Sequence, residues 1–285
     1  MTINEALRDA TKRLIENKID EASLKVRLTL AYFLDKDKEY LVIHGEDELD
    51  EKSLRVFMKN VEKLSNGMPV QYIIKKQSFM GMDLYVNEDV LIPQPDTEAV
   101  IEEVLKLAEI VNKRKNPSEK IKILDMCTGS GAIAISLAKY IYQSDVYASD
   151  ISPKALEVAD YNAKTQGYEI KLIKSNLFEK IDIEEKFDII VSNPPYIESD
   201  VIEHLPIEVQ HEPKLALDGG LDGLSFYRNI AIDAKDNLKD DGYLVFEIGY
   251  NQKYDVIRIM QDNGYRNISS KKDLSLNDRI IIGQK

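Results

Sequence analysis

The segment Ile121–Ile133 has the sequence IKILDMCTGSGAI, and this stretch decides the fold. Its first six residues read as a buried strand, and an apolar helical pattern follows the glycines as far as Ile141. Gly129 and Gly131 occupy the turn, where a missing side chain lets the backbone approach a ligand and the next helix presents its positive N-terminus. The segment therefore predicts a strand, a ligand-binding loop and a helix.

The glycine pattern is shorter than the dinucleotide-binding fingerprint. That fingerprint needs a third glycine, but Ala132 leads straight into the predicted helix, so a pyrophosphate site is the weaker interpretation. The next predicted strand, 145–150, ends in Asp150, about twenty residues after the loop, the offset of a carboxylate that binds ribose hydroxyls. Asp150 or Ser152 can alternatively cap the helix that begins at Pro153. The spacing favours a nucleoside site.

Strand and helix patterns alternate through the rest of the chain. The predicted helices are 153–165, 224–238 and 252–263, and the predicted strands are 168–175, 187–192, 243–249, 266–270 and 279–283. Such alternation predicts an α/β, Rossmann-like fold whose mostly parallel sheet is covered by helices on both faces. Ligands of these sheets bind beyond the C-terminal strand ends, so we expect the glycine loop, Asp150, Asn176 and residues 193–196 at one edge.

Asn193-Pro194-Pro195-Tyr196, here named the clamp, follows the buried-strand pattern at 187–192. A planar nitrogen is a poor nucleophile until acceptors hold its N–H bonds and aim its lone pair. The Asn193 side-chain carbonyl and the Pro194 backbone carbonyl can be those acceptors. Two prolines fix the backbone, and Tyr196 offers an aromatic wall for a flat group. The alternative is an ordinary turn, because Asn-Pro is common after a strand.

The N-terminal part is organised differently. Ile3, Leu7, Ala10 and Leu14 recur at helical spacing, and similar patterns continue to residue 64 without a strand signal. The following stretch alternates around Gly81 like a β-hairpin. We therefore expect three domains, which are a helical domain at 1–70, a β-hairpin linker at 71–92 and an α/β domain at 93–285.

Composition excludes several classes of protein. The 285 residues carry a net charge of −12, which disfavours a duplex nucleic-acid binder because phosphate neutralisation needs a basic face. A single cysteine, Cys127, allows no internal disulfide and no Cys-rich metal site, so we expect a reducing compartment and no metal. No apolar run is long enough to span a membrane, and the N-terminus lacks a signal-peptide pattern. We expect a cytoplasmic enzyme without membrane contact.

Short motifs along the whole chain carry a family resemblance. They are Gln71-Tyr72-Ile73, Phe79-Met80-Gly81, Leu91-Ile92-Pro93-Gln94-Pro95-Asp96-Thr97-Glu98, the glycine loop, the clamp with Ile197, Glu212-Pro213, Ala216-Leu217, Asp222-Gly223-Leu224, Tyr227-Arg228, Lys272-Asp273-Leu274 and Asp278-Arg279. With these motifs the chain resembles the release-factor glutamine methyltransferases. The clamp alone is shared with enzymes that methylate the exocyclic amine of adenine, whereas Leu91–Glu98 singles out the glutamine family.

The resemblance implies a fold, a reaction and partners. It implies a class I methyltransferase with a seven-stranded, mostly parallel sheet after a helical domain that docks peptide chain release factors. The enzyme would transfer methyl from S-adenosylmethionine to the side-chain amide nitrogen of the Gln in the Gly-Gly-Gln motif of those factors, modulating translation termination. It would act as a monomer. No strong general base is required, because the amide nitrogen keeps its proton until the methyl has arrived.

The resemblance also implies the site residues. Asn193, Pro194 and Tyr196 would be catalytic, and together with Pro195 they would bind the substrate. The cofactor would be held by Thr128, Gly129, Ser130, Gly131, Ala132, Asp150, Asn176, Leu177 and Asn193.

Four positions depart from the family pattern. The family usually has Arg where this chain has Gln94, Gly where it has Lys75, an acid where it has Ser78, and Asp where it has Asn176. Gln94 cannot supply the planar cation of Arg. Asn176 keeps a hydrogen-bonding amide near the expected adenine edge but loses the charge, and Leu177 is the expected apolar contact of the base.

Two other functions remain open from the sequence. An adenine methyltransferase would share the clamp and the cofactor loop, but should carry a basic target-recognition segment, and none is found. A nucleotide-binding module without catalysis would explain the glycine loop and Asp150, but it leaves the clamp without a task.

Overall fold

The computed structural model describes residues 1–285 and divides them into two compact units. Unit 1 comprises Met1–Lys76 and Leu205–His211, and unit 2 comprises Gln77–His204 and Glu212–Lys285. A short segment from late in the chain thus belongs to the first unit. The three domains expected from the sequence, at 1–70, 71–92 and 93–285, stay a prediction.

Unit 1 is built from helices. They are α1 (Ile3–Glu16), α2 (Ala22–Leu34), α3 (Lys38–Ile43), α4 (Glu51–Ser65), α5 (Val70–Ile74) and, from the late segment, α9 (Ile207–Gln210). Thr2 and Glu5 form a capping box that starts α1, and Asp50 caps α4 by accepting from the Ser53 amide. Leu14, Leu30 and Phe57 are buried in one core. The helical character predicted for this region is confirmed.

The late segment is anchored to α2 and to the end of α4. Lys25, although 6% exposed, forms an ion pair with Glu208. The His211 ring donates through Nε2 to the Asn66 carbonyl at 3.0 Å. Gly67 has φ 84°, and a Cβ there would lie 2.7 Å from Ile207, so the contact requires glycine. The helical unit is therefore completed by residues far along the chain.

Unit 2 begins with the expected hairpin. Strands β1 (Gln77–Phe79) and β2 (Met82–Leu84) pair antiparallel. The hairpin is shorter than the range 71–92 predicted for it, because α5 already occupies residues up to Ile74 and no strand follows Leu84 before α6 (Asp96–Asn112).

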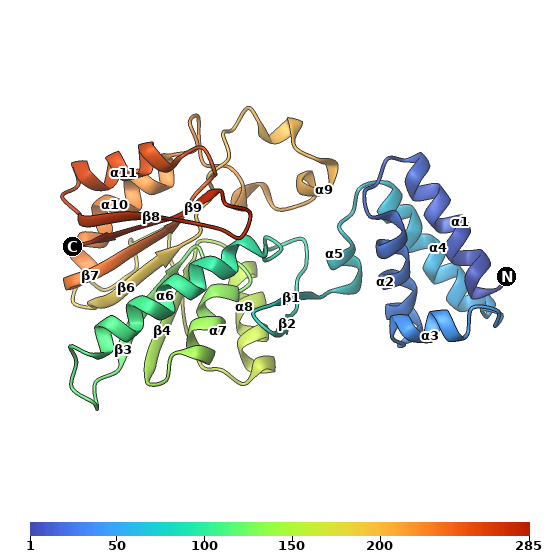
Figure 1. The fold of residues 1–285 in the computed structure, drawn as a ribbon, viewed down its shortest axis with the longest axis horizontal. Coiled ribbons are helices and arrows are strands. Elements are labelled where there is room, and N and C mark those ends of the chain that lie inside the picture. Colours follow the sequence, from blue (N-terminus) through green and yellow to red (C-terminus); the bar gives the residue numbers. More distant parts are fainter. The chain divides into compact units, whose positions relative to one another are not determined.

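A seven-stranded sheet forms the centre of unit 2 (Figure 1), in the order β5-β4-β3-β6-β7-β9-β8. Its strands are β3 (Ile121–Met126), β4 (Ser144–Asp150), β5 (Lys171–Lys174), β6 (Phe187–Ser192), β7 (Leu238–Glu247), β8 (Arg266–Lys272) and β9 (Asp278–Gln284). The first five in this order pair in parallel, whereas β9 is antiparallel to both neighbours. The predicted mostly parallel, Rossmann-like sheet is confirmed.

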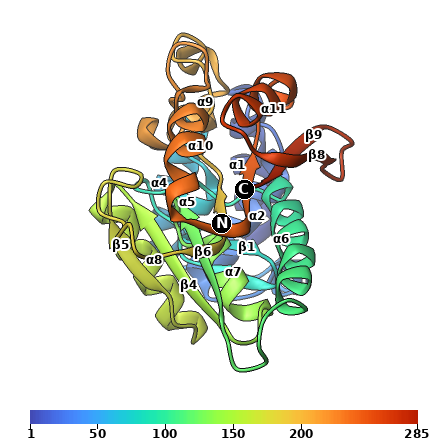
Figure 2. The same cartoon turned by 90° about the vertical axis from the view of Figure 1, so that its left-hand side faces the viewer.

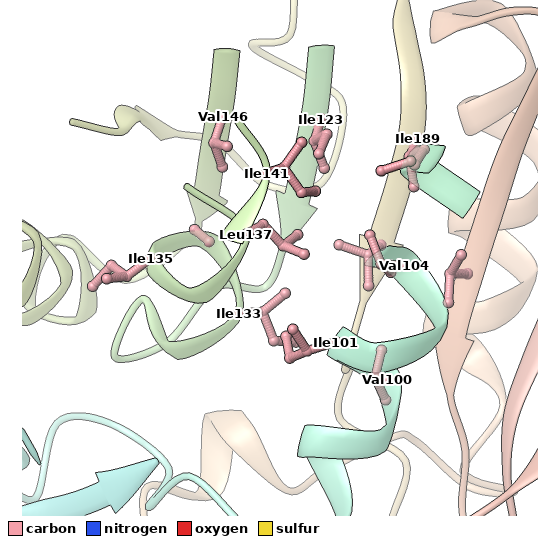
Figure 3. Packing of buried hydrophobic residues seen from close by; sticks show 14 of the residues in the cluster. Val100, Ile101, Val104, Ile123, Ile133, Ile135, Leu137, Ile141, Val146 and Ile189 are labelled. Atoms are coloured by element: carbon pink, nitrogen blue, oxygen red, sulfur yellow. The ribbon is translucent and has the colours of Figure 1, made fainter. Parts of the chain in front are cut away.

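Helices cover both faces of this sheet (Figure 2). The helices α6, α7 (Ala132–Tyr140) and α8 (Pro153–Gln166) are on one side, and α10 (Ser225–Asn237) and α11 (Lys253–Asp262) are on the other. Successive strand residues alternate between the faces, so Ile189 packs with α6 and α7 while Ile190 packs with α10 and α11. Figure 3 shows Ile101 of α6 and Ile133 of α7 pointing toward one another in the first of these cores. Two short 3₁₀ turns, η1 (Ile202–His204) and η2 (Lys214–Ala216), lie between β6 and α10.

Candidate active site

A cavity of about 230 Å³ lies where β3, β4, β5 and β6 end. Because these strands are parallel, their C-terminal ends meet at one edge of the sheet. In strand order they contribute Gly129, Asp150, Asn176 with Leu177, and Asn193 with Pro195 to its wall. The predicted convergence of the glycine loop, Asp150, Asn176 and the clamp is confirmed.

Asp150 stands at the end of β4 and faces the cavity. Its carboxylate accepts from the Gly129 and Ser152 amides, each at 2.9 Å. Burial raises the pKa of Asp150, and these backbone donors oppose the shift. Ser152, not Asp150, caps α8 by accepting from the Ala155 amide. The capping alternative for Asp150 is thereby removed, and its carboxylate suits the hydroxyls of a nucleoside.

The two loop glycines serve different purposes. Gly129 has φ 55°, lines the cavity, and a Cβ there would meet nothing within 4 Å. Gly131 has φ 81°, does not line the cavity, and its Cβ would lie 3.1 Å from Ala159 Cβ and Ile135 Cδ1. Gly129 therefore keeps the cavity open, whereas Gly131 lets α7 pack closely against α8.

The remaining predicted loop residues are not in the cavity wall. Thr128 donates through Oγ1 to Asp125 at 2.5 Å, the Ser130 carbonyl accepts from Asn162 at 2.9 Å, and Ala132 begins α7. Their side chains and backbone hold the shape of the loop. Direct cofactor contact by Thr128, Ser130, Gly131 or Ala132 stays a prediction.

Asp125 is a fully buried carboxyl beneath the glycine loop. Its Oδ2 accepts from Thr128 and from the Ala134 amide at 3.1 Å, while its Oδ1 has no partner. Burial raises the pKa of Asp125 to about 7. The sequence analysis did not single it out. The available signal was a lone acid in an otherwise apolar strand, immediately before the glycines.

The clamp is only partly in the cavity wall. Asn193 and Pro195 line the cavity, whereas Pro194 and Tyr196 do not. The Tyr196 hydroxyl lies beside Arg279, and its pKa is raised to about 12, chiefly by burial and next by the Glu247 carboxyl. The catalytic roles of Pro194 and Tyr196 stay predictions, which require the Pro194 carbonyl and the Tyr196 ring to reach the substrate.

Two glycines and a glutamine hold the backbone of the clamp. A Cβ on Gly219 would lie 2.7 Å from Tyr196 Cα, and a Cβ on Gly223 would collide with the Tyr196 carbonyl oxygen. That carbonyl accepts from Gln252 Nε2 at 2.9 Å. Ile197 adds a bridge, because its carbonyl accepts from the Gly219 amide at 2.8 Å. Side chains at positions 219 and 223 would therefore displace the clamp.

Charged residues from separate motifs meet behind the clamp. Arg279 donates to Asp96 at 3.0 Å, to Asp273 at 3.1 Å and to the Ile248 carbonyl at 3.2 Å. Neighbouring Thr97 accepts from Asn193 Nδ2 at 3.4 Å. The sequence motifs that contain Asp96, Asp273 and Arg279 thus form one support for the clamp, although the chain separates them widely.

Further parts of the wall were missed by the sequence analysis. They include the segment 88–91, the segment with Pro213, Leu215 and Ala216, and Phe226 of α10. Glu212, next to the second segment, accepts from the Ile92 amide at 2.8 Å, and burial raises its pKa to about 7. Leu91, Pro213 and Ala216 belong to motifs quoted for the family resemblance, which is the signal that was available.

The departures from the family pattern have local roles. Gln94 donates to the Ile92 carbonyl at 3.0 Å, and Asn176 donates to Glu179 at 2.6 Å. Ser78 donates to Asp83 at 2.8 Å. Lys75 takes φ 56° at the end of α5, a left-handed conformation that the usual Gly adopts without strain.

The wall of the cavity fits a positively charged nucleoside. Asp150 offers acceptors for hydroxyls, and Leu177, Ile151 and Phe226 offer apolar surface for a base. Asn176 places an amide at the same wall. These groups match the ribose and adenine of S-adenosylmethionine, and the acidic surroundings match its sulfonium cation.

Comparisons with known proteins agree with this fit. Residues 5–74 match the PrmC N-terminal domain and residues 106–209 match the methyltransferase small domain. The release factor glutamine methyltransferase of Clostridium acetobutylicum is 40% identical over 99% of this chain and 98% of its own length. That of Moorella thermoacetica is 36% identical over 100% of this chain and 99% of its own length. A methyltransferase from Pyrococcus furiosus superposes with a TM-score of 0.52 at 20% identity, covering 80% of this chain and 98% of that one, and shows the shared fold.

The doubly covered sheet and the cavity at its C-terminal edge define a class I, S-adenosylmethionine-dependent methyltransferase. At the identities given above, the chain belongs to the release factor glutamine methyltransferase family. The predicted family, enzyme class, cofactor and fold are thereby confirmed. None of its helices combines the length and the apolar character needed to span a membrane. No cluster of three or more His, Cys, Asp or Glu side chains is arranged to hold a metal.

Proposed function

We propose that this chain transfers a methyl group from S-adenosylmethionine to the side-chain amide nitrogen of the Gln in the Gly-Gly-Gln motif of peptide chain release factors. One observation carries the proposal for the site. Asn193, one of the two proposed amide acceptors, lines the same cavity as Asp150 and Leu177, so this acceptor and the nucleoside site share one space. The names of the relatives support the substrate.

Orientation supplies most of the catalysis in this proposal. When bound, S-adenosylmethionine supplies an electrophilic methyl on a sulfonium. The Asn193 Oδ1 and the Pro194 carbonyl oxygen accept hydrogen bonds from the two N–H groups of the glutamine amide. These bonds aim the lone pair of the nitrogen into the cavity. The Tyr196 ring covers one face of the amide. Holding the reacting nitrogen in this way removes the entropic cost of finding the geometry in solution.

Proton transfer plays a late role. The amide nitrogen would gain positive charge as its bond to the methyl forms and the sulfur–methyl bond breaks, which leaves a neutral thioether, and the nitrogen would then release one proton to water. The acidic residues of the cavity wall, Glu88, Asp89 and Asp150, favour cationic species there. No histidine needs to act, and none lines the cavity.

The helical domain, residues 1–70, is proposed to dock the release factor. Its helix α3 ends in two exposed apolar residues, Val42 and Ile43, whose side chains are 69% and 78% exposed. Exposed apolar neighbours of this kind favour contact with another protein. We further propose that the enzyme works as a monomer in the cytoplasm, where translation takes place, and that it does not bind duplex nucleic acid.

Transfer of labelled methyl tests the function. The full chain is incubated with labelled S-adenosylmethionine and, separately, with a release factor, the same factor with Ala for the Gln of its Gly-Gly-Gln motif, and duplex DNA. Label should enter only the first. Label in DNA would favour an adenine methyltransferase. Label in the release factor that carries Ala for this Gln would show that the glutamine amide nitrogen is not the methylated atom.

Two surface variants test the docking role. Val42→Ser with Ile43→Ser should lower methylation of the intact release factor while leaving that of a short Gly-Gly-Gln peptide near the parental rate, because only the intact factor reaches the helices. Ile183→Ser, at a 54% exposed apolar position of unit 2, is the matched control. Equal loss on factor and peptide would reject docking by α3.

A further inference from the structure

Glu247, the last residue of β7, is a buried acid that the proposed reaction does not use. Its side chain is 2% exposed, and its Oε2 has no hydrogen-bond partner. Burial raises its pKa to about 7. Burying a carboxyl without full pairing is costly. A residue in such a place needs a role that offsets this cost.

The hydrogen-bonding neighbours of Glu247 are the Thr97 hydroxyl and the Asn193 amide, both of which oppose the rise of its pKa. Thr97 also accepts from Asn193 Nδ2 at 3.4 Å. A hydroxyl that accepts from Asn193 keeps its one proton for the carboxylate. Thr97 and Asn193 thus contact each other, and each offers a proton that a neighbouring Glu247 carboxylate can accept.

Other charged groups around Glu247 come from α6, β9, α10 and the clamp. Arg279 lowers the pKa of Glu247, and Asp96 raises it. The Glu247 charge in turn raises the pKa of the Tyr196 and Tyr227 hydroxyls. The Arg279 donors are directed to Asp96, Asp273 and a backbone carbonyl. The carboxylate is thus left to Asn193 and Thr97.

This arrangement decides which way the Asn193 amide faces. An amide can turn over by exchanging its oxygen and its nitrogen, and the partners select one orientation. A carboxylate only accepts, so it attracts Nδ2 and repels Oδ1. With Nδ2 turned toward Glu247 and Thr97, Oδ1 remains for the cavity that Asn193 lines.

We propose that Glu247 is a positioning residue, which together with Thr97 fixes the Asn193 amide so that its Oδ1 faces the substrate nitrogen. The inference rests on the proposed function, because it assigns that oxygen to the glutamine N–H. Protonated Glu247 can donate to Oδ1 and hold the opposite orientation. Methyl transfer should therefore require the ionised form and increase as the pH rises through about 7.

Kinetics with isosteric variants test the role. Glu247→Gln and Thr97→Val remove the charge or the hydroxyl at nearly constant volume. Each should lower kcat roughly 10–100-fold, the range for outer partners that orient a binding side chain, with cofactor affinity by calorimetry unchanged. Thr97→Ser should restore most of what Thr97→Val loses. Glu247→Gln should also flatten the increase of kcat between pH 6 and pH 8 (about one unit on each side of the carboxyl pKa).

A double variant separates positioning from general destabilisation. If Glu247 acts through Asn193, Glu247→Gln should lower kcat no further in an Asn193→Ala background. Asp188→Asn is the control, because Asp188 is another buried acid of the sheet and pairs with Lys115 and Lys239 away from the cavity. It should lower the melting temperature with kcat unchanged. Multiplied losses in the double variant, or parental kcat in Glu247→Gln, would overturn the inference.

A spectroscopic readout does not depend on the substrate. In ¹⁵N-labelled full chain, the Asn193 side-chain amide signal, assigned by its loss in Asn193→Ala, should shift with a midpoint near the Glu247 pKa of about 7. In Glu247→Gln the shift should vanish. A signal that stays constant with pH in the parent overturns the inference even if the release factor is methylated. A titrating signal without methylation of the factor rejects only the proposed function.

Discussion

The Gln252 side chain donates through Nε2 to the backbone carbonyl of Tyr196 at 2.9 Å. The same nitrogen donates to the Gly223 carbonyl at 3.2 Å, and Oε1 accepts from the Gly249 amide at 3.0 Å and from the Tyr227 hydroxyl at 3.3 Å. One amide thus binds the clamp, the loop before α10 and the loop after β7. Its hydrogen bonds fix the clamp backbone while its own side chain stays outside the cavity wall.

Replacing Gln252 should therefore cost both stability and turnover. Gln252→Met keeps the volume but leaves buried carbonyls unpaired, and we expect a loss of roughly 1–3 kcal/mol in the free energy of unfolding. Denaturant unfolding measures it. Gln261→Met, at an exposed position of α11, is the control and should change little. A stability near the parental value would show that the bridge is dispensable.

Asn193 should act on the transition state and not on cofactor binding. Asn193→Ala removes a preorganised acceptor, and turnover should drop roughly 10²–10³-fold. Asn193→Asp keeps acceptors for the substrate but loses the Nδ2 donor to Thr97, so its turnover should lie between those of the parent and Asn193→Ala. Single-turnover rates decide between them, with cofactor titration and melting as controls. A parental rate in Asn193→Ala would reduce the clamp to a turn.

The two loop glycines should fail differently. Gly129→Met places a side chain in the open space of the cavity, so cofactor binding should weaken at least about tenfold while stability falls by about 1–2 kcal/mol for the left-handed backbone. Gly131→Ala should cost roughly 1–3 kcal/mol of stability, because its Cβ presses on Ala159 and Ile135. Calorimetric titration and thermal melting on both variants give the comparison. The reverse pattern would exchange the two roles.

Asp150 should contribute to cofactor affinity through its charge and its acceptors. Asp150→Ala should weaken binding by about 1–3 kcal/mol, the scale of a charged hydrogen bond. Asp150→Asn keeps one acceptor and should lose less. Asp160→Asn, on the exposed side of α8, serves as the control for charge alone. Unchanged affinity in Asp150→Ala would remove Asp150 from the nucleoside site.

Asp125 should make stability depend on pH. Its folded-state pKa of about 7 exceeds the unfolded value near 3.8, so the folded form binds the extra proton and its stability falls as the pH rises between these values. Asp125→Asn removes this dependence. The free energy of unfolding of the variant, relative to that of the parent, should increase by roughly 2 kcal/mol when the pH is raised from 5 to 8. Denaturant unfolding at both pH values measures the difference, and a constant difference would contradict the buried-acid assignment.

The fold could be predicted wherever a strand is buried along its length. The bounds predicted for Ile121–Met126 and Phe187–Ser192 agree with the structure because both strands are buried on both faces. β7 was expected at 243–249 but begins at Leu238, since the polar residues 239–241 interrupt the pattern although Leu238 pairs with Phe187. β5 was expected at 168–175, yet only Lys171–Lys174 pairs with β4. An edge strand is defined by its partner more than by its own sequence.

The site could be predicted where its residues end strands. Asp150 and Asn193 follow strand patterns and were found for that reason. Gln252, Glu247 and Arg279 were not, because their contacts join segments that only the folded sheet brings together. The family motifs marked some of these segments, but they could not show that Thr97 and Asn193 meet.

The late segment of the helical unit, Leu205–His211, determines when the contacts of this unit can form during translation. Lys25 is buried beside Glu208, which lies 183 residues later in the chain. At the usual ribosomal rate of about 5–20 residues per second, Glu208 is synthesised roughly 10–40 s after Lys25. The N-terminal helices therefore leave the ribosome first yet complete their packing only after the strand that carries the clamp has been translated. A nascent chain stalled before residue 205 would leave Lys25 without its ion-pair partner, although the apolar core of these helices contains no residue of the late segment.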